Sequence, residues 1–409
     1  MKYYGSPRWS GEICDCSMPM TLDTYSLCSY RCLYCFAFNW RSIGGGKGEY
    51  LQNRVRWVNP EKVMKIFTDP DSSQFGPYVK QRLAMQWGGL SDQFDEHERK
   101  HGITLELLKF FRAIQYPISF STKATWWTED ERYVSLFRGA DHFNLKFSII
   151  TLDEEKAGKV EALVPSPEER LKAMERAASW GIGGVTLRLR PFIIGVTTPS
   201  YLELIERAAD AGAEAVSTEF LCVGVNAKKR AYRRFGAISR IAGYDIIKMY
   251  KSMKGGWYLR GNREMKRPYV DAMQEKCDKL GLRFYVSDAH FKERCANGSC
   301  CGLRPEWNYS RGQFTEALVI AKEKGQVRWA DIEPGLRYAD FSFGNAEGFN
   351  QVSSERRAAH HDWSMKDYVR REWNNVNGGH SPYKYFGGVL HPVGRDGAGD
   401  VIYEYWGDD

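Results

Sequence analysis

The run Thr24-Tyr-Ser-Leu-Cys-Ser-Tyr-Arg-Cys-Leu-Tyr-Cys-Phe36 places three cysteines in one short loop. Cys28, Cys32 and Cys35 have the spacing C-x3-C-x2-C, and Tyr34 stands just before the third. A complete [4Fe–4S] electron-transfer site uses four Cys, so three thiolates leave one iron of such a cluster for a ligand that is not protein. The spacing therefore predicts an iron–sulfur cluster with one open iron.

Two plainer interpretations of these cysteines stay open. One is a structural zinc knuckle, for which Cys14 or Cys16 lies near enough in sequence to be the fourth ligand. The other is a set of scattered buried thiols. Zinc knuckles favour paired C-x2-C elements, so the spacing favours the cluster.

Composition limits the class of protein. The chain has 409 residues, 43% of them hydrophobic and 27% charged, which is ordinary for a globular protein with more than one domain. No apolar run approaches the roughly 18 residues of a membrane span, and the first residues lack the apolar stretch of a secretory signal. We expect a soluble cytoplasmic protein with no membrane association, in which the ten Cys are reduced and those clustered at ligand spacings bind metal.

Short β-prone runs alternate with helical ones from residue 20 to about 225. The predicted strands are Met20–Thr24, Leu83–Trp87, Ile118–Thr122, Leu145–Ile150, Val185–Leu189 and Ala213–Ser217; the predicted helices include Leu105–Tyr116, Glu129–Phe137, Pro167–Trp180 and Tyr201–Ala211. Parallel strands joined by crossover helices curl into a barrel whose chemistry lies at the carboxyl ends of the strands. The pattern predicts an α/β fold, a partial (β/α)6 TIM-type barrel with the cysteine loop at its rim.

The predicted domain division follows from where this alternation ends. Residues 1–19 are an N-terminal extension, 20–225 the barrel, and 226–409 a C-terminal α+β extension, with helices over Gly243–Met253 and Lys266–Leu280 and a strand over Arg283–Ser287. The last hundred residues show no clear period, but Trp and Tyr are too frequent there for disorder. The run Gly44–Gly48 lacks the G-x4-G-K-[ST] pattern and is expected to be a flexible loop.

Three further runs sharpen the interpretation. They are Gly88-Gly-Leu-Ser-Asp-Gln-Phe-Asp-Glu-His-Glu98, Lys159-Val-Glu-Ala-Leu-Val-Pro-Ser-Pro-Glu-Glu-Arg-Leu171 and Arg190-Pro-Phe-Ile-Ile-Gly195. With the cysteine loop, they resemble the radical SAM superfamily, and within it the DNA-repair-photolyase-like relatives of spore photoproduct lyase. The resemblance implies a [4Fe–4S] cluster that binds S-adenosylmethionine and cleaves it to a 5′-deoxyadenosyl radical. It further implies hydrogen abstraction from a nucleic-acid base or nucleotide; a peptide or small metabolite is the alternative substrate.

The resemblance also implies cofactor-binding residues. Gly88, Gly89 and Ser91 match the positions that bind the methionine amino group, and Lys123 the position that meets its carboxylate. Further candidates are Ser148, Arg188 and Arg190 on the ribose and sulfonium side, and Tyr34 for packing on the adenine. Spore photoproduct lyase carries a hydrogen-returning Cys where this chain has Gly89, so we expect a modification or rearrangement other than thymine-dimer repair.

A second group of cysteines lies at Cys295-Ala-Asn-Gly-Ser-Cys-Cys301. We expect Cys295, Cys300 and Cys301 to bind metal with Cys277 as the fourth ligand, and Cys222 and His290 are other candidates. We expect an auxiliary Fe–S cluster at this second site; a zinc ion, or ordinary thiols that bind no metal, are the alternatives. Adjacent cysteines point in different directions and seldom share a metal, which favours only one of Cys300 and Cys301 as a ligand.

The segment from Lys228 to Asp271 is strongly basic. It holds thirteen Lys or Arg against three Asp or Glu, interleaved with aromatic residues. Cations neutralise phosphates and aromatic faces stack on unpaired bases, so this composition is typical of a DNA or RNA groove; a solvated basic helix face is the plain alternative. An electron donor of flavodoxin or ferredoxin type is the other expected partner.

Overall fold

The computed structural model describes residues 3–10, 14–41, 54–198, 200–224, 229–253, 258–297, 299–311, 313–336 and 364–407. The predicted loop Gly44–Gly48 lies outside the described residues. In the part of the chain that is described, no helix has both the length and the apolar character needed to cross a membrane.

Eight strands form one sheet in the order β1-β2-β3-β4-β5-β6-β7-β10. Their bounds are β1 (Arg8–Trp9), β2 (Met20–Leu22), β3 (Met85–Trp87), β4 (Ile118–Thr122), β5 (Phe143–Ser148), β6 (Gly184–Phe192), β7 (Ala215–Phe220) and β10 (Arg283–Val286). Neighbours from β2 to β10 pair in parallel, and β1 is antiparallel to β2. The predicted partial (β/α)6 barrel is confirmed, with β10 as a further parallel strand.

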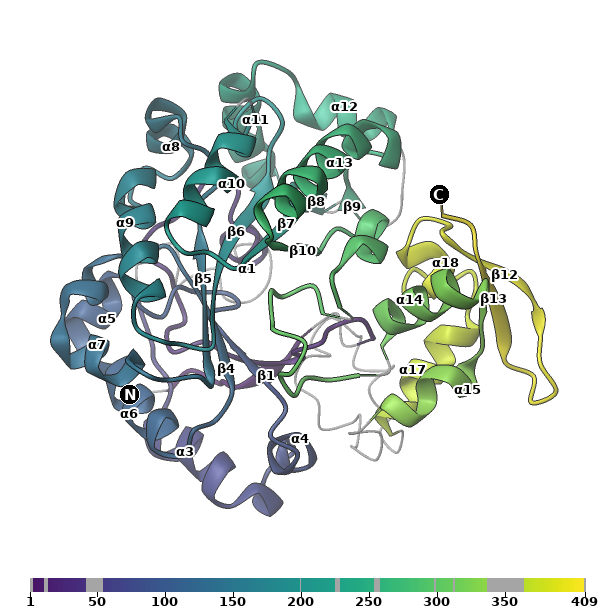
Figure 1. The fold of residues 1–409 in the computed structure, drawn as a ribbon, viewed down its shortest axis with the longest axis horizontal. Coiled ribbons are helices and arrows are strands. Elements are labelled where there is room, and N and C mark those ends of the chain that lie inside the picture. Colours follow the sequence, from purple (N-terminus) through teal and green to yellow (C-terminus); the bar gives the residue numbers. More distant parts are fainter. Residues whose placement is uncertain are drawn as a thin grey trace.

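Helices cover the outer face of this sheet (Figure 1). They are α3 (Pro60–Thr68), α4 (Gly76–Lys80), α5 (Glu96–His101), α6 (Ile103–Ala113), α7 (Glu131–Phe137), α8 (Glu154–Val160), α9 (Pro167–Ala178), α10 (Tyr201–Asp210), α11 (Lys229–Ala242), α12 (Ile246–Ser252) and α13 (Arg263–Leu280); α1 (Phe36–Arg41) follows the cysteine loop, and β8 (Val223–Gly224) pairs with β9 (Tyr258–Leu259). The start of α9 agrees with the sequence, because Ser166 and Glu169 form a reciprocal capping box there.

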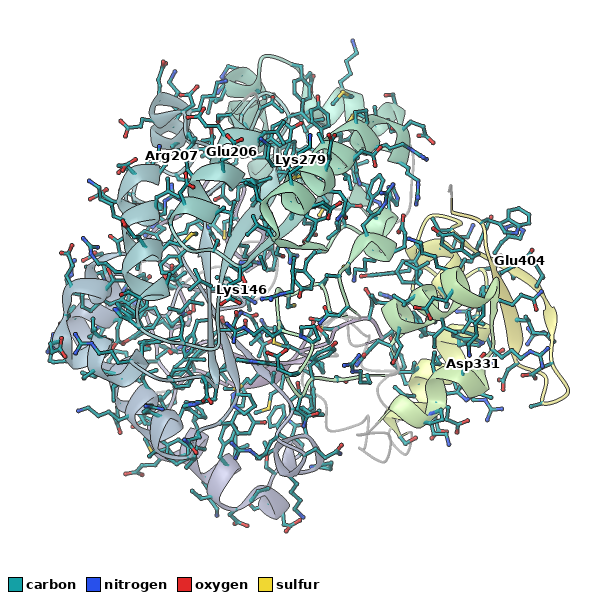
Figure 2. All side chains as sticks on the ribbon, in the orientation of Figure 1. Lys146, Glu206, Arg207, Lys279, Asp331 and Glu404 are labelled. Carbon is teal, nitrogen blue, oxygen red and sulfur yellow. The ribbon has the colours of Figure 1, made fainter. Side chains whose placement is uncertain are left out.

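The strands are buried on both faces, as parallel strands between helices and a filled barrel must be. On the outer side Phe120 packs on Trp87, with ring centroids 5.3 Å apart, and on Phe137 at 5.4 Å. On the inner side, polar and charged residues alternate with these aromatics. Figure 2 shows Lys146 of β5 near the middle of the barrel, whereas Glu206, Arg207 and Lys279 lie on the covering helices.

The barrel is open between its first and last strands, since β1 and β10 are the two ends of the described sheet. Residues 299–310 cross this opening. On one side the amide of Ala84 donates to the carbonyl of Asn308 at 2.7 Å. On the other, the Tyr285 hydroxyl of β10 donates to the carbonyl of Leu303 at 2.7 Å. Segments predicted to belong to the C-terminal extension therefore contribute both a strand and a side wall to the barrel, while the predicted domain boundaries stay a prediction.

The rest of the C-terminal region forms a small α+β unit beside the barrel (Figure 1). It contains α14 (Phe314–Lys324), α15 (Trp329–Ile332), α17 (Met365–Asn374) and α18 (Pro382–Tyr385), with the antiparallel sheet β11-β13-β12 formed by β11 (Gln326–Val327), β12 (Leu390–Arg395) and β13 (Val401–Tyr405). Trp373 lies at its centre: its indole donates to the carbonyl of Val401 at 2.8 Å, and its own carbonyl accepts from the Tyr403 hydroxyl at 2.6 Å. The expectation that the aromatic-rich tail is ordered holds for residues 364–407.

Candidate active site at the cysteine loop

The cysteine loop follows β2 and is fixed from three sides. The amide of Ser29 donates to the Asp95 carboxylate at 2.6 Å, and the amide of Leu33 to the carbonyl of Val160 at 2.9 Å. From α11, the Arg234 guanidinium donates to the carbonyls of Arg31, Cys32 and Leu33. Arg31 has φ +49°, in the left-handed region, so the loop turns sharply between its first two cysteines. The thiols are thus presented by an anchored loop at the carboxyl edge of the sheet.

Cys28, Cys32 and Cys35 share one electrostatic environment. Burial raises the pKa of Cys28 well above its usual range, and Asp95, Asp92 and the other two thiols add to the rise. Burial also raises the pKa of Cys32 to about 12, although the nearby Lys123 ammonium opposes the rise. Removing the protons from several buried thiols that lie close together is costly. A bound cationic group would offset the negative charge of the resulting thiolates, so the site is suited to such a group.

The donor set fits an iron–sulfur cluster. Among the described residues, no three Cys, His, Asp or Glu side chains converge closely enough to hold a single metal ion. In a [4Fe–4S] cluster each cysteine binds a different iron, so the sulfur atoms need not converge on one point. Three neighbouring thiols on one fixed loop therefore fit the ligands of such a cluster.

A buried ionic network lies directly beside the loop. Glu161 accepts a hydrogen bond from the Tyr34 hydroxyl. It also forms an ion pair with Arg170 at 2.8 Å, and the side chains of Glu161 and Arg170 are each only 1% exposed. The Lys123 ammonium lies 4.0 Å from Glu161 and 5.8 Å from the centre of the Tyr34 ring. The structure thus brings together two of the predicted residues, Lys123 and Tyr34, next to Cys32.

The loop after β3 is built around two buried carboxylates. Asp23 accepts from the amides of Leu90 at 2.6 Å and Ser91 at 3.1 Å. Asp92 accepts from the amide of Lys123 at 2.6 Å and from the Thr122 hydroxyl, so it fixes the backbone that carries Lys123. Burial raises the pKa of Asp92, and its hydrogen bonds oppose that rise.

Backbone geometry explains the glycines in this loop. Gly88 has φ +89°, and a Cβ there would lie 2.2 Å from the Gln93 side chain. A Cβ on Gly89 would lie 2.5 Å from Cγ2 of Thr21, which a β-branched side chain in a strand cannot easily move away. Ser91 is buried, and its hydroxyl donates to the carbonyl of Tyr25 at 2.9 Å. The predicted residues Gly88, Gly89 and Ser91 therefore lie together on a tightly packed turn.

Ser148, Arg188 and Arg190 lie on adjacent strands. Ser148 of β5 pairs with Arg188 of β6 in the sheet, and its carbonyl accepts from Arg170 at 2.7 Å. Burial lowers the pKa of Arg188 to about 10, Arg190 contributes to that lowering, and Tyr34 and Cys301 are among its charged neighbours. Arg190 forms an ion pair with Glu219 of β7. Arg188 thus lies between the cysteine loop and the second group of cysteines.

Several residues that shape this site were not expected from the sequence: Asp23, Asp92, Glu161, Arg170, Arg234 and Lys146. Asp23 and Asp92 could have been noticed because Asp23 lies at the carboxyl end of the predicted strand Met20–Thr24 and Asp92 follows the predicted strand Leu83–Trp87. Glu161 and Arg170 lie within the run Lys159–Leu171 but were not singled out. No sequence signal connects Arg234 with the loop that it holds more than two hundred residues earlier.

In the second group of cysteines, two expectations differ from the structure. The sulfur atoms of Cys300 and Cys301 lie 3.9 Å apart, so these adjacent side chains point to the same side rather than in different directions. The second concerns Cys277, which is buried on α13 in the hydrophobic core, with Asp278 as the charged group that affects its pKa. The structure therefore does not place Cys277 with Cys295, Cys300 and Cys301.

The other suggested ligands are also held elsewhere. Cys222 lies near Tyr250. Burial raises the pKa of Tyr250 well above its usual range, and Tyr244 and Cys222 add to the rise. The Nδ1 atom of His290 lies 3.4 Å from the Lys266 ammonium, which forms a buried ion pair with Asp288 at 2.7 Å. Burial, helped by Lys266, lowers the pKa of His290 to about 3. His290 therefore lies beside the Lys266–Asp288 ion pair rather than with the cysteines.

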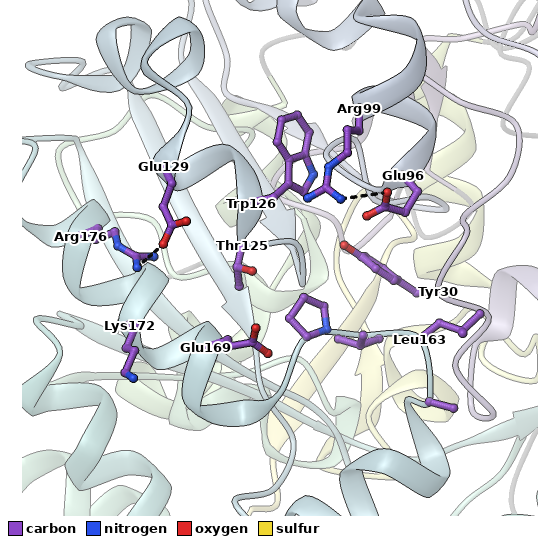
Figure 3. Close-up of a pocket in the computed structure, with 13 residues that line it drawn as sticks. Tyr30, Glu96, Arg99, Thr125, Trp126, Glu129, Leu163, Glu169, Lys172 and Arg176 are labelled. Atoms are coloured by element: carbon purple, nitrogen blue, oxygen red, sulfur yellow. Dashed lines mark hydrogen bonds and ion pairs between the residues drawn. The ribbon is translucent and has the colours of Figure 1, made fainter.

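A surface cleft of about 510 Å³ lies outside the cysteine loop, with Tyr30 of that loop in its wall (Figure 3). Its charged side chains neutralise one another: Arg99 pairs with Glu96 at 3.2 Å, and Arg176 pairs with Glu129. The Arg99 guanidinium also lies over the Trp126 ring, 5.0 Å from its centre. The cleft carries no concentration of one charge that would mark it as a binding site.

The basic segment is partly structural. Lys266 is fully buried in its pair with Asp288, and Arg263 pairs with Glu293 at 2.8 Å. Three of its described aromatic residues pack inward: Phe235 and Tyr250 are buried, and Tyr269 packs on Phe192 with ring centroids 5.4 Å apart. The exposed residues include Arg233, Arg240, Lys248 and Lys251. The interleaved pattern is thus largely that of amphipathic helices, with cations on their outer faces.

Comparison with known proteins gives a broad likeness in fold. No protein-family model and no curated protein matches the chain. Among solved structures, it is similar to SuiB of Streptococcus suis (13% identity, TM-score 0.42, covering 66% of this chain and 50% of SuiB). It is also similar to TYW1 with a lysine–pyruvate adduct bound (14%, 0.32, 56% and 73%) and to OxsB, a cobalamin-dependent S-adenosylmethionine radical enzyme (10%, 0.31, 87% and 47%). The chain spans about half the length of SuiB.

Proposed function

We propose that this chain is a radical SAM enzyme with a [4Fe–4S] cluster on Cys28, Cys32 and Cys35. The observation that carries the proposal is a trio of thiols on one anchored loop, at the carboxyl edge of a parallel barrel and beside the cation of Lys123. When bound, the reduced cluster would supply cleavage of S-adenosylmethionine to a 5′-deoxyadenosyl radical. The electron would come from a flavodoxin- or ferredoxin-type donor.

The chain's own residues would position the cofactor. Lys123 offers a cation suited to the methionine carboxylate, and Glu161 at 4.0 Å holds it in place. The turn Gly88–Ser91 offers backbone groups where side chains would not fit, and the second lone pair of the Ser91 hydroxyl is suited to an ammonium group. Tyr34 is fixed through its hydroxyl, which leaves its ring as an apolar surface beside Lys123.

We propose a nucleic-acid base or nucleotide as the substrate, modified or rearranged by a route that does not use a hydrogen-returning cysteine at position 89. The exposed cations of α11 and α12 support this substrate class, because phosphate contacts come from such residues. The inward packing of Phe235, Tyr250 and Tyr269 favours the second candidate, the same radical chemistry on a peptide or small metabolite, since it removes three of the surfaces on which bases would stack.

The test is an anaerobic assay of 5′-deoxyadenosine formation with dithionite as the reductant, with and without DNA, RNA and peptide pools. The reconstituted protein is expected to form 5′-deoxyadenosine, and Cys32→Ala to form none. Cys277→Ala is the matched control, since it also removes a buried thiol but lies in the core of α13. Wild-type protein that binds no iron and forms no product would refute the proposal. Stimulation by a nucleic acid, lost as salt rises, would identify the first substrate class; stimulation by peptides alone, the second.

A further inference from the structure

We propose that Lys146 and Arg188 form an oxyanion site on the inner face of the barrel, which holds a carboxylate or phosphate group of the substrate. The two cations lie on neighbouring strands, and neither is paired with a carboxylate in the described part of the chain. The inference deepens the proposed function and rests on it, since the bound anion is taken to be part of the substrate.

The pairing of the strands places Lys146 on the inner face. Its neighbours in β5, Leu145 and Phe147, are fully buried in the hydrophobic core, and the side chains of a strand alternate between its two faces. The Lys146 ammonium donates to the amide oxygen of Gln86 on β3, which lies two strands away. The Gln86 amide in turn donates to the Ser121 hydroxyl of β4 at 3.0 Å. These contacts cross the inside of the barrel and hold the ammonium near its middle (Figure 2).

Arg188 lies on the next strand, one step nearer the carboxyl edge. In the register of β5 and β6, Lys146 pairs with Thr186 and Ser148 pairs with Arg188. Paired residues of a sheet point to the same face, so Arg188 shares the inner face with Lys146. With strands about 4.8 Å apart and a rise of about 3.3 Å per residue, the Cα atoms of Lys146 and Arg188 are about 8 Å apart. Two long side chains at this spacing can contact one oxyanion from two sides.

The strands around this point carry more positive than negative charge. Strands β4 to β7 hold three cationic side chains, Lys146, Arg188 and Arg190, against the single carboxylate of Glu219. Arg190 forms an ion pair with Glu219, which leaves Lys146 and Arg188 as the excess. Burial lowers the pKa of Lys146 to about 8; Cys301 opposes that fall and Arg188 adds to it.

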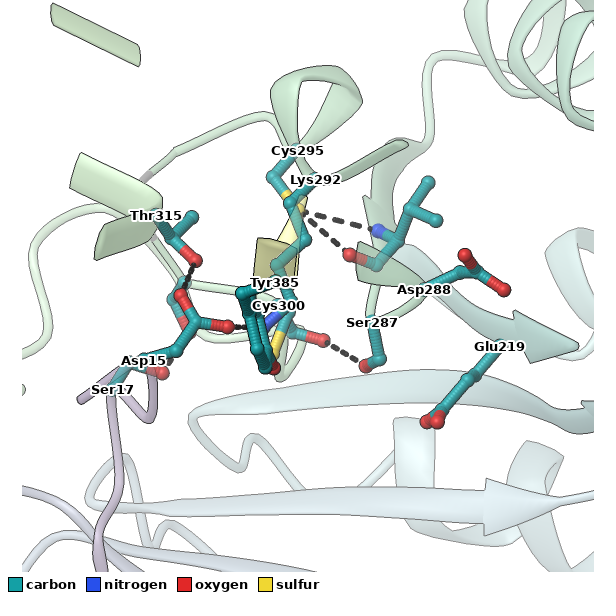
Figure 4. A network of polar contacts seen from close by, with 12 residues as sticks. Asp15, Ser17, Glu219, Ser287, Asp288, Lys292, Cys295, Cys300, Thr315 and Tyr385 are labelled. Carbon is teal, nitrogen blue, oxygen red and sulfur yellow. Dashed lines mark hydrogen bonds and ion pairs between the residues drawn. The ribbon is translucent and has the colours of Figure 1, made fainter. Parts of the chain in front are cut away.

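The Cys301 thiol can offset only one of these two charges. The carbonyl of Cys300 accepts from the Ser287 hydroxyl at 3.2 Å (Figure 4), which holds this loop against the end of β10. Cys301 follows directly and is a charged neighbour of both Lys146 and Arg188. A thiolate there carries one negative charge, so one positive charge remains uncompensated. A buried cation without an anionic partner is costly, and a bound oxyanion would remove that cost.

The donors of the two cations are suited to an oxyanion that enters from the carboxyl edge. Arg188 is partly exposed, whereas Lys146 is 3% exposed and forms the inner end of the site. An ammonium has three N–H donors, and the side chain of Arg188 forms no hydrogen bond with a described residue. A guanidinium binds carboxylate and phosphate through two parallel hydrogen bonds, which leaves a further oxygen lone pair for Lys146.

The experiment measures anion binding by the full chain, purified under reducing conditions without added iron. Urea unfolding midpoints are recorded as inorganic phosphate or acetate replaces chloride at constant ionic strength, because an anion that binds only the folded chain raises the midpoint. Lys146→Met and Arg188→Gln should each weaken anion binding about 10- to 100-fold, as expected for a lost charged hydrogen bond. Lys109→Met, on the exposed face of α6, should bind the anion as the wild type does.

The same data separate a binding role of Lys146 from a structural one. In chloride alone, the midpoint of Lys146→Met should be no lower than that of the wild type, because the variant removes an uncompensated buried cation. A larger response to phosphate than to acetate would identify a phosphate-bearing substrate, and the reverse a carboxylate-bearing one. A wild type that responds to neither anion, equal responses in the wild type and both variants, or a Lys146→Met chain that is much less stable in chloride would overturn the proposal.

A second measurement distinguishes this site from the cofactor site and from the proposed function. Calorimetry on the reconstituted chain should give equal S-adenosylmethionine binding in the wild type and Lys146→Met; a loss as large as that for the anion would assign Lys146 to the cofactor and overturn its role toward the substrate. A chain that binds no iron but still binds the anion through Lys146 would refute the proposed function and leave the anion site.

Discussion

Replacing Arg170 by Met should destabilise the protein strongly, because it removes the nearest cation from the buried Glu161 carboxylate and leaves only Lys123, 4.0 Å away. Both side chains are 1% exposed and lie 2.8 Å apart. Removing one partner of such a pair typically costs about 3–5 kcal/mol, most of it the penalty of an uncompensated buried charge. Arg170 also donates to the carbonyl of Ser148 at 2.7 Å, so a second buried acceptor loses its partner. The lost hydrogen bond adds to the cost and the remaining Lys123 ammonium reduces it, so we expect a loss within that range.

The matched control lies on the same helix. Arg176 pairs with Glu129, but these side chains are 38% and 63% exposed, so Arg176→Met should cost at most about 1 kcal/mol. Urea unfolding followed by tryptophan fluorescence gives both free energies, and the double variant Arg170→Met/Glu161→Gln should recover part of the loss, because no charge is then left buried. Two results would refute this reasoning: an equal loss of unfolding free energy in Arg170→Met and Arg176→Met, or a double variant that is less stable than Arg170→Met.

Four further outcomes are expected. Gly89→Cys should lower the free energy of unfolding by about 1–3 kcal/mol, because the new Cβ meets Thr21; a urea midpoint equal to that of the wild type would contradict this. Lys123→Met should weaken S-adenosylmethionine binding about 10- to 100-fold in calorimetry, as expected for a lost charged hydrogen bond, whereas Lys109→Met on the exposed face of α6 should leave it unchanged. Burial lowers the pKa of His97 to about 4, so the unfolded chain takes up the proton first and stability falls as the pH drops from about 6.5 to 4; His97→Asn should reduce the difference between urea midpoints at pH 7 and pH 5. A chain that ends at residue 225 should be recovered mainly as aggregate, since β7 loses its partner β10, and a monodisperse, iron-binding product would count against this.

Local signals predicted the barrel well because they act within a few residues. Ser166 and Pro167 mark the start of α9 through capping chemistry that needs no tertiary contact. The strand Ile118–Thr122 has the predicted bounds, since its short β-prone run begins directly after Pro117. The same locality explains why the cysteine loop could be placed at the rim of the barrel from its position after the first strand.

The remaining parts of the site depend on contacts that no local pattern encodes. Glu161 could not be distinguished from a surface glutamate, because its burial depends on Arg170 and Tyr34 arriving from other elements. The aromatic residues of the basic segment could not decide the substrate class for the same reason: interleaving with cations is typical of nucleic-acid grooves and equally of amphipathic helices, and the sequence does not show which of these side chains are packed. The orientation of Cys300 and Cys301 was also not predictable from their adjacency, since their sulfur atoms lie 3.9 Å apart on the same side of the chain.

The candidate site belongs to both halves of the chain. The loop that carries the cysteines needs Arg234 of α11, because three of its carbonyl groups, those of Arg31, Cys32 and Leu33, receive their hydrogen bonds from that one guanidinium. Buried carbonyls left without a donor are costly, so the loop and α11 stabilise each other. The open side of the barrel is likewise lined by residues 299–310, which contact β3 and β10 at once. Because the contacts of Arg234 and of Asn308 each join a segment before residue 225 to one after it, the rim of the barrel takes its final shape only when the C-terminal region has folded against it.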